Sequence, residues 1–126
     1  GPMPQTKFVL KKALDLDPDY VDAWVRKGVT HYDDKDFYGA DLCFNKAISL
    51  SPLSFKVLYN RGKNRIALNE HELALTDLLT ASSLKPDHAS CHEYIAEAYN
   101  GVGNITLADE HLQQARYLRG HANDED

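Results

Sequence analysis

The sequence predicts an all-α protein in which pairs of helices follow one another in a row. An alanine, a leucine three positions later and a proline two beyond that recur every 34 residues, in "KKALDLDPD", "NKAISLSPL" and "LTASSLKPD". Between these phrases the apolar residues are three and four positions apart, which is the period of an α-helix and not of a strand. Each proline lacks an amide donor and therefore ends the helix before it. A repeat of this length indicates one structural unit per copy.

The first predicted element is a single helix at residues 5–17. Its Leu10, Ala13 and Leu16, with Pro18 after them, match only the second half of a copy. We therefore expect this helix to be the second helix of a partial repeat, in a chain cut from a longer repeat protein. Residues 1–4, "GPMP", are interpreted as the remnant of an expression tag.

Three full copies follow, at residues 21–54, 55–88 and 89–119, and residues 120–126 form a polar tail. In the first copy Val21, Trp24 and Val29 lie on one face of a predicted helix. Phe37 and Ile48 belong to a second predicted helix in the same copy. Because two helices recur in each copy, every unit is predicted to be a helical hairpin.

Capping residues support these helix boundaries. Asp19, Ser54 and Asp87 stand where the first helices of the hairpins are expected to begin, and short polar side chains favour the N-cap position. Asp36 and Asn104 stand at the equivalent places before second helices. The capping pattern therefore agrees with the apolar spacing.

The turn inside each hairpin needs a residue that tolerates a positive φ angle. Gly103 and Asn69 meet this need well, and Lys35 meets it less comfortably. These three residues are therefore expected in left-handed backbone conformations.

Small residues recur where the helices are expected to cross. A side chain larger than a methyl group at a crossing would push the helix axes apart. Larger side chains, among them Phe44 and Leu78, are expected to fill the space beside the crossings. The small residues fall in three aligned pairs, Gly28 with Ala40, Gly62 with Ala74, and Ala96 with Ala108.

This pattern resembles the tetratricopeptide repeat, whose signature runs Trp, Leu, Gly, Tyr, then Ala, Phe, Ala and Pro. The chain departs from it at Lys27, His31, His92 and Gly120. The resemblance covers residues 5–119 and implies a right-handed α-solenoid of three repeats plus an N-terminal single helix. The matching residues are Trp24, Gly28, Ala40, Phe44, Ala47, Pro52, Gly62, Ala74, Ala81, Pro86, Tyr99, Ala108 and Ala115.

The resemblance also implies a concave groove, lined by the first helices, that binds a peptide or helix of another protein. Every repeat contributes a tyrosine to this predicted surface, and tyrosine offers a large contact area at low entropic cost. The predicted groove residues are Val25, Val29, Tyr32, Lys56, Tyr59, Asn60, Lys63, Tyr94 and Glu97.

One subtype of the family can be tested from the sequence alone. Co-chaperone domains of this family hold a C-terminal carboxylate with lysines, asparagines and an arginine, because a carboxylate needs converging donors. Asn60 matches one of these positions, whereas Val25, Val29, Ser90 and Tyr94 stand at the others. We therefore do not expect this chain to bind chaperone tails.

Composition argues against several other functions. The 126 residues carry a formal net charge of −5, and nucleic-acid binders need a concentrated basic face. No uncharged apolar stretch is long enough to span a membrane. His88, Cys91 and His92 could begin a zinc site, but no further Cys/His pair lies nearby to complete it, so packing roles are expected for Cys91 and for Cys43. No catalytic residues, metal or cofactor are predicted.

Two functions remain open. The first is a non-catalytic protein-binding module that presents its groove to a partner. The second is an architectural segment of a longer array, whose uncapped ends stack on neighbouring repeats or on another copy of the chain. Two cysteines are too few for a disulfide framework, so a reducing, cytoplasmic location is expected.

Overall fold

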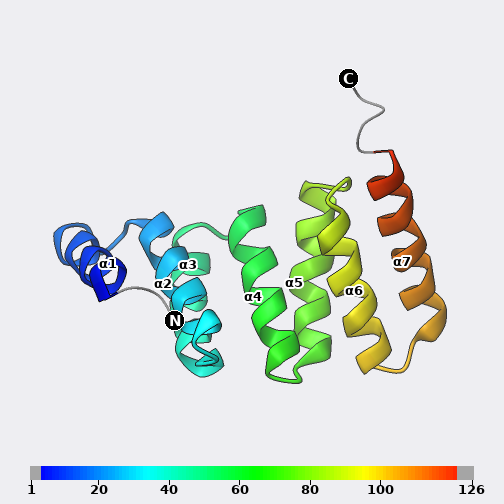
Figure 1. Ribbon diagram of the computed structural model, residues 1–126, viewed down its shortest axis with the longest axis horizontal. Coiled ribbons are helices and arrows are strands. Elements are labelled where there is room, and N and C mark those ends of the chain that lie inside the picture. The colour runs from blue at the N-terminus through cyan, green and yellow to red at the C-terminus, as the bar shows by residue number, and fades with distance from the viewer. Residues whose placement is uncertain (1–3, 122–126) are drawn as a thin grey trace.

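The protein is described here by a computed structural model that covers the backbone of residues 4–121 and the side chains of residues 5–121. The helices of this part of the chain follow one another in a row (Figure 1). The predicted all-α solenoid is therefore confirmed. The helices are α1 (Pro4–Leu16), α2 (Val21–Asp33), α3 (Phe37–Leu50), α4 (Phe55–Ala67), α5 (His71–Leu84), α6 (Ala89–Gly101) and α7 (Ile105–Gly120).

The helices form hairpins that stack side by side. α2 packs on α3, α4 on α5, and α6 on α7, while α3 also packs on α4 and α5 on α6. α1 packs on α2 through Leu10, Leu14 and Ala23. The indole N–H of Trp24 donates to the Pro18 carbonyl at 2.6 Å, which fixes the chain between these two helices.

Glycine and alanine leave room at the helix crossings, as predicted. Gly28 is buried, and a Cβ atom placed there would lie 2.5 Å from the Phe44 ring. A Cβ atom at Gly62 would lie 2.5 Å from Leu78. Large side chains therefore fill the space that Gly28 and Gly62 leave, and each of these two glycines faces the large residue of its own hairpin. Ala96, which has this place in the third repeat, is 1% exposed.

The N-caps are partly those predicted. The side chain of Ser54 accepts a hydrogen bond from Val57 N–H, and those of Asp36 and Asn104 cap α3 and α7. The prediction for Asp19 and Asp87 is wrong by one residue.

Tyr20 precedes α2 without a side-chain cap, and His88 caps α6 with its ring. These two loops end one residue later than the acidic residues suggest. The caps are therefore set by the length of the turn and not by residue type alone.

The turns inside the hairpins have the predicted left-handed residues. The φ angle is 62° at Lys35, 60° at Asn69 and 84° at Gly103. A non-glycine residue in this region is strained, and the strain is small for asparagine. The hairpin turn therefore overrides the preference of Lys35.

A buried carboxylate ties α4 to α5. Asp77, 2% exposed, accepts hydrogen bonds from Arg61 at 2.8 Å through both oxygens and from Arg65 at 2.9 Å. Arg61 also donates to Asn45 on α3 at 3.2 Å. One network therefore links three successive helices.

Some predictions concern residues that the structure does not describe. Residues 1–3 of the predicted tag remnant and residues 122–126 of the predicted polar tail lie outside the described residues. α7 continues through Gly120, where the tail was expected to start. Within residues 4–121 no helix is long and apolar enough to cross a membrane.

Candidate functional site

The first helices of the hairpins line one side of the solenoid. α2 contacts α4 and α4 contacts α6, whereas α3, α5 and α7 do not contact one another within the described part of the chain. Helices that approach their equivalents in the next repeat lie on the inside of the curve. We call this side, formed by α2, α4 and α6, the inner face. The predicted groove residues all lie on these three helices.

Lys63 on α4 occupies the middle of the inner face. Its Nζ atom lies 5.3 Å, 5.4 Å and 5.3 Å from the ring centroids of Tyr32, Tyr59 and Tyr94, respectively. The three tyrosines come from three successive repeats, and Tyr59 and Tyr94 also make an edge-to-face contact at 5.8 Å. An ammonium group within about 6 Å of a ring centroid is attracted by the ring. We call Lys63 with these three tyrosines the Lys63 centre.

The phenols of the Lys63 centre stay protonated at neutral pH. Burial raises the pKa of Tyr59 to about 12, with the neighbouring Tyr94 adding to the effect. Burial also raises the pKa of Tyr32 and of Tyr94, and the charge of Glu97 raises both further. Each phenol can therefore donate a hydrogen bond as well as offer its ring.

Charged groups link equivalent positions of the first two repeats. Lys56 Nζ donates to the Asp22 carboxylate at 2.8 Å, and Arg26 pairs with the same carboxylate at 3.0 Å. The hydrogen bond from Lys56 holds the pKa of Asp22 below its usual value. At the other end, Arg119 on α7 pairs with Glu93 on α6. The cations at both ends of the inner face therefore have acidic partners within the chain.

Asn60 and Glu97 complete the predicted set on this face. The amide group of Asn60 donates to the Lys56 carbonyl of its own helix at 2.8 Å, which leaves its side-chain oxygen for other contacts. Glu97 is exposed on α6, where its charge acts on Tyr32 and Tyr94.

Val25 is the predicted groove residue that needs correction. It is 2% exposed and packs in the core with Phe44 and Val57. Val57 of α4 and Phe44 of α3 pack against Val25, so its side chain has almost no surface left for a partner. Val29, one helical turn later, is partly buried against the same cluster and keeps some exposed surface.

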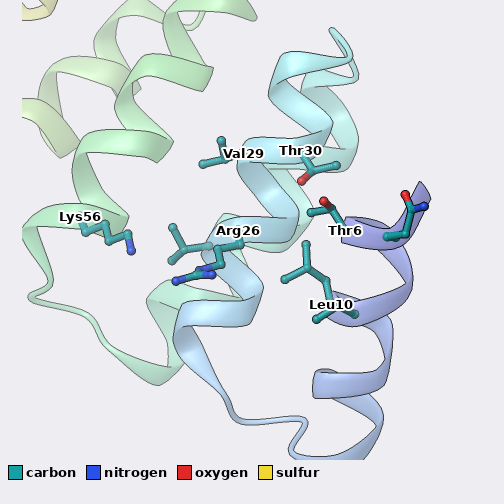
Figure 2. A pocket seen from close by; sticks show the side chains of 9 residues that line it. Thr6, Leu10, Arg26, Val29, Thr30 and Lys56 are labelled. Atoms are coloured by element: carbon teal, nitrogen blue, oxygen red, sulfur yellow. The ribbon is translucent and has the colours of Figure 1, made fainter. Parts of the chain in front are cut away.

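A cleft lies at the N-terminal end of the inner face, between α1 and α2, and has a volume of about 430 Å³. Figure 2 shows Leu10 and Thr6 of α1 on the same side of α2 as Thr30, while Val29 of α2 and Lys56 of α4 lie on the other side. We call it the α1–α2 cleft. Its apolar walls suit an aliphatic or aromatic side chain.

The histidines considered as metal ligands have other partners. Nδ1 of His88 accepts the backbone N–H of Cys91 at 3.1 Å, so it serves as a helix cap. Nε2 of His92 lies 2.7 Å from the Pro86 carbonyl, and its Nδ1 lies 3.0 Å from Nδ1 of His111. Because a carbonyl only accepts, His92 carries its proton on Nε2 when neutral, and His111 then donates. Burial lowers the pKa of His111.

The sequence predicted the three tyrosines on this face but not that Lys63 lies between their rings. The position of Lys63 between three rings depends on how far apart successive repeats lie, which one copy of a repeat does not reveal. The Asp77 network was also missed. Its signal is a lone acid on an apolar face of α5, sixteen residues after Arg61.

Comparison with known proteins identifies the repeat. The family model described as the tetratricopeptide repeat matches residues 21–52. BBSome complex member BBS4 of Xenopus tropicalis is 30% identical over 101 residues, which cover 80% of this chain and 20% of that protein. The STIP1 homolog of Dictyostelium discoideum is 39% identical over 84 residues, which cover 67% of this chain and 15% of that protein. The chain thus spans a fifth or less of the length of these relatives.

Solved structures with the same arrangement of helices include MamA. One crystal structure of MamA has a TM-score of 0.83 at 22% identity, covering 88% of this chain and 65% of that one. MamA from Desulfovibrio magneticus RS-1 also has a TM-score of 0.83, at 23% identity, covering 86% of this chain and 62% of that one. At these identities the likeness concerns the fold.

Proposed function

Because the chain belongs to the tetratricopeptide repeat family, we propose that it is a protein-interaction module that holds a peptide or helix of a partner along its inner face. The partner runs across α2, α4 and α6 and contacts Val29, Tyr32, Lys56, Tyr59 and Lys63. Asn60, Tyr94 and Glu97 complete the proposed contact surface.

The observation that carries this proposal is the Lys63 centre. Three aromatic side chains and one cation from three repeats converge at the middle of the inner face. Each of the four side chains is half-buried, so it is held in place and still has surface to offer. Partly buried tyrosines clustered at the centre of a surface are typical of binding hot spots.

Peptide display tests the proposal directly. Random peptides are selected on the wild-type chain, and the affinity of the best binder is measured for the Tyr59→Ala/Lys63→Glu double variant. We expect binding to weaken by about a hundredfold, because hot-spot truncations each cost about 1–2 kcal/mol or more.

The matched control carries the same two types of substitution outside the inner face. Tyr38 and Lys46 are exposed on α3, so Tyr38→Ala/Lys46→Glu should bind like the wild type. A groove variant that binds as well as this control would refute the proposal.

The proposed module is non-catalytic and cytoplasmic. The inner face offers rings, a cation and amides, with no nucleophile and base assigned to it. Both cysteines are buried and unpaired, and burial raises the pKa of Cys43 and of Cys91, which keeps them as thiols. Free buried thiols suit a reducing compartment.

The second candidate function is architectural. α1 exposes Phe8, Val9 and Leu16 at 65%, 61% and 81%, and α7 exposes Ile105 at 66%. Exposed apolar side chains at the two ends of a solenoid favour stacking on a further repeat or on another copy of the chain.

Light scattering over a concentration series tests this second candidate. If the ends pair, the apparent mass rises with concentration, and Phe8→Ser/Val9→Ser returns the chain to a monomer. A constant monomer mass at every concentration would exclude self-association through these ends.

A further inference from the structure

We propose that the Lys63 centre holds a carboxylate side chain of the partner, from an aspartate or glutamate, and excludes partner cations. This inference rests on the proposed function and adds the chemistry of the partner. Three observations support it. Lys63 is charged and unpaired among the described residues, and three tyrosine rings hold its ammonium group in place. Without Lys63, the same rings would form a site for a cation.

No direct ion pair neutralises Lys63 in the described part of the chain, although the charges of Glu97 and Asp33 act on the neighbouring Tyr32. The ammonium group of Lys63 forms no ion pair there, whereas Lys56 on the same helix is paired with Asp22. Tyrosine rings attract the ammonium group but carry no net charge. Lys63 therefore keeps a positive charge, unpaired among the described residues, that a partner carboxylate would complement.

The ammonium group of Lys63 is also held in position. Three ring faces at 5.3–5.4 Å surround it, so the long side chain does not need to be ordered when a partner arrives. Cutting this ordering cost strengthens binding. Tyr32, Tyr59 and Tyr94 also carry protonated phenols, which can donate hydrogen bonds to a partner.

A carboxylate fits this centre better than a phosphate group does. Phosphate sites are built from several cations, above all arginines. The arginines at the two ends of the inner face are already paired, Arg26 with Asp22 and Arg119 with Glu93. The charges of Glu97 and Asp33 also act on Tyr32 and would repel a dianion more than a monoanion.

Lys63 also blocks a site that the tyrosines would otherwise form. Three ring faces directed at one point are the arrangement that binds cations in proteins. Lys63 fills that point, so a lysine or arginine of the partner would meet a like charge. Without Lys63, the same rings should accept a partner cation.

Peptide display against two variants tests this inference. Random peptides are selected on the wild type, on Lys63→Met and on the control Lys46→Met. The wild type and the control should select peptides with Asp or Glu at one fixed position. Lys63→Met keeps an unbranched side chain near the rings but removes the charge. This variant should select peptides with Lys or Arg at that position instead.

Synthetic peptides give the size of the effect. Replacing the selected acid by its amide should weaken binding to the wild type about tenfold or more, because a charge-assisted hydrogen bond is lost. The same replacement should change binding to Lys63→Met by less than about twofold. Phosphoserine at that position should bind no better than glutamate.

Distinct results overturn the inference and the proposed function. Two results overturn only the inference. In the first, binding depends on Tyr59 but the selected peptides show no preference for an acid. In the second, replacing the acid by its amide weakens binding equally to the wild type and to Lys63→Met. A tenfold gain from phosphoserine would assign the centre to phosphopeptides and also overturn it. Peptides that bind regardless of the groove variants, or a selection that returns no binder, contradict the proposed function as well.

Discussion

His88 caps α6 only while its ring is neutral. Its Nδ1 atom accepts the backbone N–H of Cys91, and a protonated ring has no acceptor. Burial lowers the pKa of His88 below its ordinary value of 6.5. The unfolded chain therefore takes up the proton first as the pH falls. The stability from this cap is fully present above the unfolded pKa and is lost as the pH falls through the lower folded pKa.

Replacing His88 by serine should remove this pH dependence. Serine is a good N-cap that does not titrate in this range, so His88→Ser keeps the cap, which is worth about 1 kcal/mol. Urea unfolding at about pH 7.5 and about pH 5.5 measures the effect. The wild type should lose more stability than His88→Ser on acidification. Equal losses would show that His88 does not couple folding to pH.

Some functional features of single residues could be predicted from the sequence, and others could not. A tyrosine in every repeat could be identified from the sequence, because the register of the repeats places each one on a first helix. The burial of Val25 could not be predicted from the sequence, because it depends on how closely Val57 of the next repeat approaches it. The cap at His88 was missed because histidine is not a typical N-cap residue and Asp87 beside it is.

At the scale of helices, the positions of the hairpins follow from the 34-residue period. Small residues at the crossings were predicted from it, and the structure places Phe44 and Leu78 against them. The 34-residue period does not predict the hydrogen bonds and ion pairs between helices. The Asp77 network uses Arg61, Arg65 and Asn45, which do not recur in the other copies.

Filling the crossing at Gly28 should separate α2 from α3. Gly28→Val adds atoms where even a Cβ lies 2.5 Å from the Phe44 ring, and that ring is buried. We expect a loss of about 2–3 kcal/mol in the free energy of unfolding, since overpacking outweighs the small gain in helix propensity.

Gly120→Val is the control for Gly28→Val, because nothing lies within 4 Å of a Cβ atom at that position. Chemical denaturation should show a change of no more than about 0.5 kcal/mol there. Similar losses at both glycines would contradict the packing role of Gly28.

Removing the buried acid should weaken the contact between α4 and α5. Asp77→Ala leaves Arg61 and Arg65, each about one-sixth exposed at 16% and 15%, without their carboxylate. Breaking such a pair costs about 3–5 kcal/mol, and the remaining exposure of the arginines favours the lower end of this range.

Denaturant unfolding of Asp77→Ala beside Asp109→Ala measures this cost. Asp109 is exposed on α7, so its replacement should change stability by less than about 0.5 kcal/mol. A loss at Asp77 no greater than that at Asp109 would show that the network contributes little to stability.

At the scale of the whole molecule, contacts between successive first helices define the inner face. The sequence resemblance predicted which helices line it, because every repeat has the same register. It did not predict that the cations at both ends would be paired while Lys63 has no ion pair within residues 5–121. That difference arises from how three repeats come together, and it is the basis of the proposed preference for an acidic partner.

Backbone amide shifts in an NMR titration would show whether a partner peptide lies along the inner face. A peptide selected on the wild-type chain is added to labelled protein, and the shifted amides are mapped on the helices. We expect the largest shifts on α2, α4 and α6, around Tyr32, Lys63 and Tyr94. Shifts confined to α3, α5 and α7 would contradict this expectation.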